Sequence, residues 1–577
     1  MPSSRAPQPS IPMQGTASTQ RTFLLLLAFT ALLYVVNFHI NDIWTENESF
    51  YADAVRVMLQ KGDFLNITYN GEPRFVKPPL TYWLMAASAS VFGLNEFALR
   101  LPIVVMAFWT VLLTWSMARM LYGDKAALYA LAMQAIGIQF IAGKQYASPE
   151  IPLAFFFTLT LWLFLKSEKS GNSWYSTAAA AALGLTVLTK GFPYFIVIGG
   201  IIITYITVDA RFNAKNIFRR IWSHRPLSGA LIAVAIGMSW ILAMYLSYGS
   251  EYLKVLSNET VERAFSYNGN LLKDLFFYPE VILWSFFPYS LVFYFALIGT
   301  FLQPSRLRNI ALPMAWFTVM LVIFTASKGK IPTYFIQAHP AMALLTAAWM
   351  STSPAPSNKA LALLWKATFI LPAVIGVALS VAMVQVFSFH PAFYAIPVIA
   401  LILMLAPYTR SLYYAPFIGT FSALFIFSTA LMPQLETRRP IDSLGRAVVN
   451  ENQIPGNIPI HVENGDLYNV PFYTGRKAFY YASTADMPLQ AAPLLALVKT
   501  TNLPDSLRQY GIWRSDIYTA RSSESRLMIF IRYHLKAQKG DMSGFTNFTA
   551  IYRKAETAGT SPLPNEPRST NHAEPDH

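Results

Sequence analysis

About thirteen apolar segments, each close to the length of a membrane-crossing helix, lie between Phe23 and Met432. A helix needs about 20 apolar residues to cross the hydrocarbon core, and only helices or closed barrels can do so, so these segments predict an all-α polytopic membrane protein. Charge agrees, because 13% of the 577 residues are charged, against about 25% in soluble domains. The segments cover 23–39, 101–121, 126–142, 151–165, 174–189, 194–208, 228–247, 278–302, 309–325, 335–350, 361–386, 392–407 and 411–432.

Basic residues are distributed unequally among the loops between these segments. If the N-terminus is cytoplasmic, the cytoplasmic loops hold most of them, including Arg211, Arg219 and Arg220. Positive residues gather on the cytoplasmic side of membrane proteins, which explains the net charge of +14 without invoking nucleic acid. An odd number of crossings then places the C-terminal region outside. The chain has no cysteine, which excludes disulfides and thiolate metal sites.

Composition divides the chain into four parts. Residues 1–20 and 556–577 are rich in Pro, Ser and other polar residues and are predicted to be disordered. Residues 21–435 form the predicted transmembrane domain, with a first outer loop over 41–98, and residues 436–555 form a small α/β domain outside the membrane. Within that domain, IPIHVE and RLMIFIRYHL are predicted as strands, and LGRAVVNEN and AAPLLALVKTTN as helices.

The first outer loop contains a predicted interfacial helix. Thr45 followed by Glu48 matches a capping box, Tyr51 begins a series of apolar residues at helical spacing, and Gly62 is suited to end the helix. The segment 80–94 is too short to cross a bilayer comfortably and is predicted to be a second interfacial element.

Three acids in or near this loop are candidates for chemistry. Glu46 and Glu48 lie at the N-terminus of the interfacial helix, where the helix dipole favours an ionised carboxylate that could accept a proton. Glu150 follows Ser148-Pro149 at the outer end of an apolar run. For each acid, simple helix capping is the structural alternative.

Several cations break the inside-positive trend. Lys77 lies in the stiff Lys-Pro-Pro sequence, Lys190 at the outer end of a segment, and Lys328 and Lys330 in an outer loop, with Arg263 a weaker candidate. Each alone could be a lysine that reaches toward lipid head groups. Together they favour a site for a phosphate at the outer face.

Six motifs, in order, resemble the polyprenyl-phosphate-sugar glycosyltransferases. They are ENESFYADAVRVMLQKGDF, NGEPRFVKPPLTYW, FGLNEFALRLP, SPEIPLAFFFTLTLWLFL, LTKGFPYF and SKGKIPTYFIQAHPAMALL. This family includes protein O-mannosyltransferases and, more similar here, the bacterial transferase that adds 4-amino-4-deoxy-L-arabinose to lipid A. The resemblance covers roughly residues 22–435.

The resemblance implies a GT-C helical bundle with a soluble outer domain, and a donor sugar attached to undecaprenyl or dolichyl phosphate. The family's acidic pair in the first loop aligns with Asn47-Glu48, so an amide stands where the family has its usual Asp. Val76 stands where the lipid A enzymes tend to have an acid, which weakens any transfer of a metal site. The family also implies three cavity-lining residues: Tyr51, Tyr82 and Tyr334.

The sequence therefore predicts a glycosyltransferase of the bacterial inner membrane whose site faces the periplasm. An acid among Glu46, Glu48 and Glu150 would act on the acceptor hydroxyl, and Asn47 is included among the catalytic candidates because it stands at the family's acidic position. The cations would hold the donor phosphate. The acceptor would be lipid A, another glycolipid or a protein. No cofactor is predicted firmly, and a divalent metal remains an option. The alternatives are a flippase for polyprenyl-linked sugars and a catalytically inactive relative that binds a glycolipid.

Overall fold

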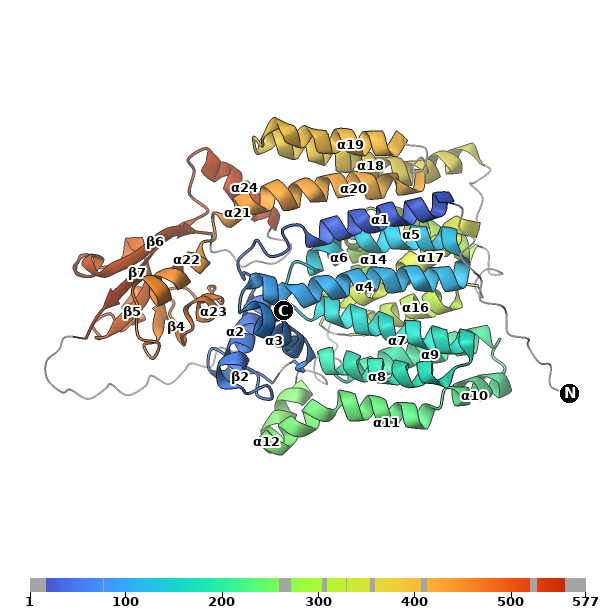
Figure 1. Cartoon of the computed structure of the whole chain (residues 1–577), viewed down its shortest axis with the longest axis horizontal. Helices are drawn as coiled ribbons and strands as arrows, with labels where there is room; N and C mark the ends of the chain where they lie inside the picture. Colours follow the sequence, from blue (N-terminus) through green and yellow to red (C-terminus); the bar gives the residue numbers. More distant parts are fainter. Residues whose placement is uncertain are drawn as a thin grey trace.

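The computed structural model has two parts, a long bundle of helices and a smaller domain with a sheet at one end of it (Figure 1). The structure describes residues 17–75, 77–258, 271–302, 309–327, 329–352, 358–405, 412–518 and 527–555. The first helix begins at Ala17, inside the segment predicted to be disordered, and the predicted disordered tail lies outside the described residues.

The bundle is helical wherever an apolar segment was predicted, which confirms the fold class. Five single helices of the described residues, and one bent pair, are long and apolar enough to cross a membrane, so the count of about thirteen crossings stays a prediction. Its elements are α1 (Ala17–Val35), α4 (Glu96–Tyr122), α5 (Asp124–Ile136), α6 (Ile138–Gly143), α7 (Glu150–Ser170), α8 (Ser173–Lys190), α9 (Pro193–Asp209), α10 (Ala214–Ser223), α11 (Pro226–Gly237), α12 (Ser239–Ser257), α14 (Leu271–Ser285), α15 (Ser290–Phe301), α16 (Ala311–Ala326), η3 (Pro332–Ala338), α17 (His339–Thr352), α18 (Lys359–Val386), η4 (Pro391–Tyr394), α19 (Ala395–Leu405), η5 (Leu412–Tyr414), α20 (Ala415–Ile426), η6 (Phe427–Leu431) and α21 (Met432–Glu436).

Three segments predicted as continuous are interrupted. Segment 126–142 divides into α5 and α6 at Gly137, and segment 228–247 bends by 48° between α11 and α12 at Met238. Segment 278–302 divides into α14 and α15 around Pro288, whose ring cannot continue a helix. Hydropathy predicts which segments are long enough to cross a bilayer, but it does not predict where a helix breaks within a segment.

Helix α17 forms the centre of the bundle, because every residue from His339 to Met350 is buried. The outer helices instead expose large apolar side chains, such as Leu363 (70% exposed) and Leu405 (78%). An apolar surface of this kind suits lipid and not water. Helix α10, with Lys215, Arg219 and Arg220, lies at the end of the bundle opposite the sheet domain (Figure 1).

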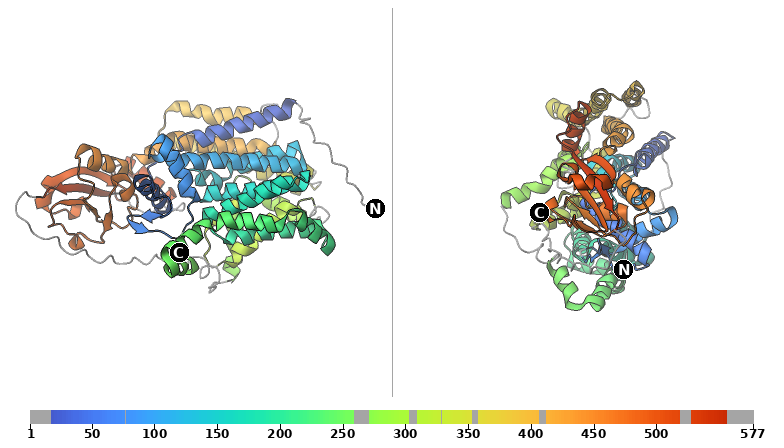
Figure 2. Two further views of the ribbon diagram at one scale, coloured as in Figure 1. Left: turned by 60° about the horizontal axis from the view of Figure 1, so that its bottom comes forward. Right: turned by 90° about the vertical axis from the view of Figure 1, so that its left-hand side faces the viewer.

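The first outer loop folds as predicted. Helix α2 (Glu46–Lys61) begins after Thr45, whose hydroxyl accepts the backbone N–H of Glu48, and ends at Gly62 in the left-handed conformation. A short hairpin of β1 (Thr68–Tyr69) and β2 (Glu72–Pro73) follows, and then α3 (Leu80–Phe92). Figure 2 shows this loop between the bundle and the sheet domain.

The C-terminal domain is built on a five-stranded sheet of order β4-β3-β5-β7-β6. Strand β3 is parallel to β4 and β5, whereas β7 is antiparallel to β5 and β6, which gives the predicted α/β fold class. The elements are α22 (Ile441–Arg446), η7 (Ala447–Glu451), β3 (Ile460–Val462), α23 (Val470–Thr474), β4 (Ala478–Tyr480), η8 (Thr484–Asp486), β5 (Leu494–Lys499), η9 (Thr500–Asn502), η10 (Asp505–Tyr510), β6 (Gly511–Ile517), α24 (Leu527–Gln538) and β7 (Thr546–Arg553).

Two predictions in this domain were wrong. RLMIFIRYHL forms helix α24, which buries Phe530, His534 and Ala537 at helical spacing. AAPLLALVKTTN contains strand β5, whose residues 494–498 are all buried. A strand covered on both faces has a continuous apolar run, which periodicity alone cannot distinguish from a buried helix.

The sheet domain is joined to the first outer loop by buried hydrogen bonds. The Tyr473 hydroxyl accepts the backbone N–H of Ile43 at 2.6 Å and donates to Glu96 Oε1 at 2.6 Å. The Asn469 amide donates to the Ile43 carbonyl at 2.7 Å. These bonds fix the domain over one end of the bundle.

Candidate functional site

Lys190 and Glu150 form an ion pair at the end of the bundle that carries the sheet domain. Lys190 is the last residue of α8 and Glu150 the first of α7, so the antiparallel packing of these two helices brings their ends together. The Lys190 Nζ lies 3.2 Å from Glu150 Oε1, and the two side chains are only 8% and 14% exposed. The structure thus brings together two residues that the sequence selected independently.

Aromatic residues surround this pair. The Lys190 Nζ lies 5.1 Å from the centroid of the Tyr334 ring. Tyr51 and Tyr82 stack with ring centroids 4.1 Å apart, and Glu150 lies within electrostatic range of Tyr51. We call Glu150, Lys190, Tyr51, Tyr82 and Tyr334 the Lys190 cluster. It includes the three tyrosines for which a cavity-lining role was predicted.

Two tyrosines of the Lys190 cluster, Tyr51 and Tyr82, have hydrogen-bonding capacity to spare. The Tyr51 and Tyr82 hydroxyls lie near each other and near Arg74, yet neither makes a well-aligned hydrogen bond with a described residue. Burial, together with Tyr82 and Glu150, raises the pKa of Tyr51 well above its usual value. Neutral, buried hydroxyls of this kind can orient a polar ligand.

Lys330 joins the same region through a short turn. Its Nζ donates to the Ser327 carbonyl at 2.7 Å and lies 3.3 Å from Asp274 Oδ2. Four residues later, Tyr334 on η3 lies beneath Lys190. Of the other predicted phosphate ligands, Lys77 is described and half-buried, whereas Lys328 and Arg263 lie outside the described residues.

Glu48 makes its ion pair and hydrogen bonds with residues outside the Lys190 cluster. Its Oε1 accepts from Arg100 Nε at 2.8 Å and from the backbone N–H of Ala147 at 2.8 Å, and its carboxylate is fully buried. The remaining Arg100 nitrogens donate to the carbonyls of Asn41 and Asp42. This network gives Glu48 a structural role. Glu46 is exposed and Asn47 half-exposed, so Glu150 is the predicted acid that the fold places in the Lys190 cluster.

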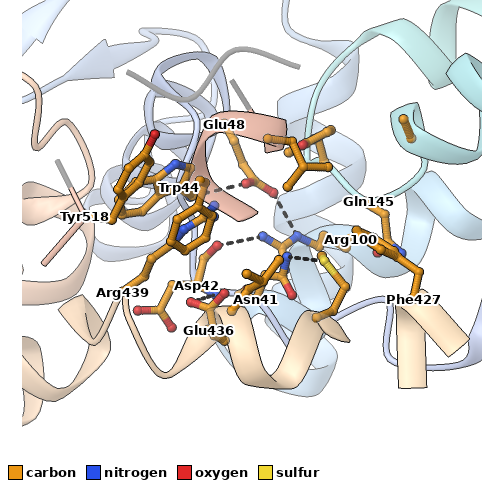
Figure 3. Close-up of a pocket in the computed structure, with 16 residues that line it drawn as sticks. Asn41, Asp42, Trp44, Glu48, Arg100, Gln145, Phe427, Glu436, Arg439 and Tyr518 are labelled. Carbon is orange, nitrogen blue, oxygen red and sulfur yellow. Dashed lines mark hydrogen bonds and ion pairs between the residues drawn. The ribbon is translucent and has the colours of Figure 1, made fainter. Parts of the chain in front are cut away.

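A separate pocket of about 110 Å³ lies where the bundle meets the sheet domain (Figure 3). We call it the junction pocket. The pKa of Asp42 on its wall is raised to about 8, first by burial and then by the neighbouring Glu436 carboxylate. The pocket is lined by Asn41, Asp42, Trp44, Glu48, Arg100, Ala142, Gln145, Tyr146, Phe427, Met432, Leu435, Glu436, Arg439, Tyr518, Leu527 and Phe530.

Sequence reasoning missed most of the charged residues of the junction pocket. Arg100 had a usable signal, because an arginine in the second turn of a long apolar helix indicates a buried partner. Asp42 and Arg439 had none, since they lie in connecting segments and meet only through the docking of the two domains. Among the described residues, no group of three or more His, Cys, Asp or Glu could hold a metal ion.

Comparisons with known proteins give one consistent result. A family model of dolichyl-phosphate-mannose-protein mannosyltransferases matches residues 76–241. An uncharacterised protein of Aquifex aeolicus is 34% identical over 79% of this chain and 87% of its own. An undecaprenyl phosphate-alpha-4-amino-4-deoxy-L-arabinose arabinosyl transferase of Pseudomonas savastanoi is 26% identical over 57% of this chain and 61% of its own, which is less than two thirds.

A solved structure extends the likeness to nearly the whole fold. ArnT from Cupriavidus metallidurans, crystallised with undecaprenyl phosphate, superposes with a TM-score of 0.67 over 93% of this chain and 98% of its own. The sequence identity is 18%, so this likeness concerns the fold. It includes the C-terminal region, for which the sequence motifs carried no match.

Proposed function

Because this chain belongs to the GT-C superfamily of membrane glycosyltransferases, we propose that it transfers a sugar from a polyprenyl-phosphate carrier to an acceptor hydroxyl. The observation that supports this most directly is the Lys190 cluster, which combines a buried lysine, a carboxylate and two hydroxyls without well-aligned partners. The cluster lies at the end of the bundle that carries the sheet domain.

In the proposed reaction, the donor phosphate binds Lys190 and Lys330, with Lys77 as a further ligand. The acceptor oxygen attacks the anomeric carbon while the bond from that carbon to the phosphate oxygen breaks. The leaving phosphate needs cationic stabilisation and no protonated acid. The acceptor proton passes to a carboxylate, which we assign to Glu150.

The Lys190–Glu150 ion pair suggests how the carboxylate becomes available. In the resting protein, Lys190 neutralises Glu150 at 3.2 Å. A donor phosphate that binds Lys190 competes with the Glu150 carboxylate for the lysine ammonium group. This leaves Glu150 free to accept a proton. Binding of the donor would therefore activate the base, and the base would stay masked when no donor is present.

We further propose the bacterial inner membrane as the location, with the Lys190 cluster facing the periplasm. The gathering of basic loops at the end opposite the sheet domain supports this orientation. Aminoarabinose as the sugar and lipid A as the acceptor are the specific form of the proposal, supported by similarity to arabinosyl transferases. A flippase is less well supported, because transporters place their sites near the bilayer midplane.

The test is transfer in proteoliposomes, with a labelled sugar on undecaprenyl phosphate and lipid A as the acceptor. Lys190→Gln should lower the rate about 100- to 1000-fold, the cost of removing one preorganised charge-stabilising donor. Glu150→Gln should also abolish most transfer but keep donor binding. Lys539→Gln, at an exposed turn of the sheet domain, is the matched control. Full activity of Lys190→Gln would refute the proposal, and movement of intact donor would indicate a flippase.

A further inference from the structure

The junction pocket is distinct from the Lys190 cluster, but two chain segments contribute residues to both. Ala142, Gln145 and Tyr146 line the pocket. The same segment continues to Ala147, whose N–H is held by Glu48, and then to Glu150 of the Lys190 cluster. On α2, Glu48 faces the pocket, and Tyr51, one turn later, belongs to the cluster.

One wall of the pocket is a layered stack of aromatic rings and an arginine (Figure 3). The Arg439 guanidinium lies 4.2 Å from the centroid of the Trp44 ring and 4.1 Å from that of Phe530. Arg439 is 8% exposed, and its Nε has no hydrogen-bond partner among the described residues. The stack therefore presents a fixed, planar donor to the pocket at little further cost in side-chain entropy.

The opposite wall supplies acceptors. The Asn41 Oδ1 is buried and has no partner in the described part of the chain. The carboxyls of Asp42 and Glu436 lie beside it, each already holding one backbone N–H: Asp42 accepts from Asp442 at 3.0 Å, and Glu436 accepts from Asp42 at 3.0 Å. The pocket thus combines an unmet donor, an unmet acceptor and aromatic surface.

We propose that the junction pocket binds one ring of a neutral carbohydrate, an unphosphorylated sugar of the acceptor. A sugar hydroxyl both donates and accepts, so it can satisfy Arg439 Nε and Asn41 Oδ1 together. The C–H face of a pyranose can pack on an aromatic ring. Only the identification of this sugar as the acceptor rests on the proposed function.

Charge and size narrow the class of ligand. A simple cation would be repelled by the Arg439 guanidinium. A neutral polyol does not meet this repulsion. The volume of about 110 Å³ is below the roughly 300–1,000 Å³ of pockets for drug-sized ligands, which favours a small ligand.

The binding test uses the full-length protein in nanodiscs without donor. Methyl glucopyranoside and methyl xylopyranoside serve as probes in saturation-transfer NMR. We expect signals from the ring C–H protons of at least one probe with the wild-type protein. Arg439→Met and the milder Asn41→Ala should each reduce these signals at least threefold. Arg446→Met, at an exposed arginine of the same domain (side chain 59% exposed), should leave them unchanged.

Two results would overturn the proposal. One is the absence of a signal from either probe, which would mean that the pocket binds neither sugar. The other is a signal that persists in Asn41→Ala and Arg439→Met, which would place the sugar elsewhere. Thermal unfolding of each variant shows whether Arg439→Met is folded, and Asn41→Ala keeps the test valid if it is not.

A kinetic test separates this inference from the proposed function. Asn41→Ala should raise the KM for the acceptor at least threefold and leave donor binding unchanged. If sugar binding depends on Asn41 but the wild-type protein transfers no sugar, the pocket stands and the proposed function fails. If transfer occurs and the acceptor KM does not change in Asn41→Ala or Arg439→Met, the function stands and the pocket is not its acceptor site.

Discussion

Glu48 and Arg100 form a buried ion pair in which both partners also hold backbone groups. Removing one partner leaves an uncompensated buried charge, which typically costs about 3–5 kcal/mol. We therefore expect Arg100→Met to lower the thermal stability of the detergent-solubilised protein strongly. The double variant Glu48→Gln/Arg100→Met should recover part of the loss, because no charge is stranded. A double variant less stable than Arg100→Met would contradict this interpretation.

Tyr51 offers a residue-level test that separates stability from activity. Its buried hydroxyl makes no well-aligned hydrogen bond with a described residue. Tyr51→Phe should therefore change the unfolding temperature little, since a buried polar group without a good partner contributes little to stability. Transfer should nevertheless fall about tenfold or more if the hydroxyl orients the donor, a loss of about 1.4 kcal/mol in the transition state. A large loss of stability with normal transfer would assign Tyr51 to the fold alone.

At the scale of elements, α18 and α20 approach most closely at two glycines. A Cβ placed on Gly376 would lie 2.3 Å from the Gly419 carbonyl carbon, and one on Gly419 would lie 2.4 Å from the Ala373 carbonyl oxygen. Close backbone contact through small residues is a common way to join helices in a membrane. These backbone neighbours cannot move aside as a flexible side chain could.

Gly419→Ala should therefore force α18 and α20 apart and destabilise the protein by at least about 1–3 kcal/mol, the usual cost of overpacking. Gly199→Ala is the matched control, because Gly199 also lies in a helix and a Cβ there would meet nothing within 4 Å. That substitution should be neutral or slightly stabilising, since alanine favours helix. Equal thermal stabilities of the two variants would refute the predicted crossing.

The elements that sequence could predict are those whose signal is local. Thr45 and Gly62 flank α2 and Glu48 lies in its first turn, and these residues placed α2 correctly at both ends. Strand β5 was mistaken for a helix because its burial comes from β3, β7 and the packing on both faces of the sheet. Helix α24 was mistaken for a strand because its β-branched and aromatic residues outweighed a helical spacing that only tertiary packing makes visible.

In the candidate site, too, sequence could predict only the features whose signal is local. Lys190 and Glu150 could be selected because each breaks a rule of membrane composition at its own position. Their pairing, and the stack of Tyr51 on Tyr82, follow from packing between segments that sequence does not order in space. Arg439 could not be selected, because an arginine in a polar linker breaks no rule.

At the scale of the whole molecule, the two domains are joined by bonds between residues about 400 positions apart. Asp42 accepts the N–H of Asp442, and Glu436 accepts the N–H of Asp42. Both carboxyls line the junction pocket, so the docking of the domains and the shape of that pocket depend on the same groups. Changes in the ionisation of Asp42 or Glu436 should therefore change how the two domains dock.

Asp42 makes that dependence measurable. Burial and the Glu436 carboxylate raise its pKa from 3.8 to about 8. Between these values the folded protein holds a proton that the unfolded chain has released, so this carboxyl lowers stability as the pH rises from about 4 to about 8. Asp42→Asn removes the titration and can still accept the Asp442 N–H. At about pH 8 the variant should be more stable than the wild type by at least about 1.4 kcal/mol, the equivalent of one pKa unit.

The measurement is the unfolding midpoint in detergent between about pH 5 and about pH 9, which spans most of the range over which this carboxyl titrates. Wild-type stability should fall toward the upper end more steeply than that of Asp42→Asn. The control is Asp486→Asn, since Asp486 is exposed on the sheet domain and its replacement should reproduce the wild-type slope. If Asp42→Asn and the wild type have parallel profiles, Asp42 is ionised in the folded protein, and the coupling between its proton and domain docking does not exist. A flatter profile in Asp42→Asn alone would place the titrating group at the junction itself.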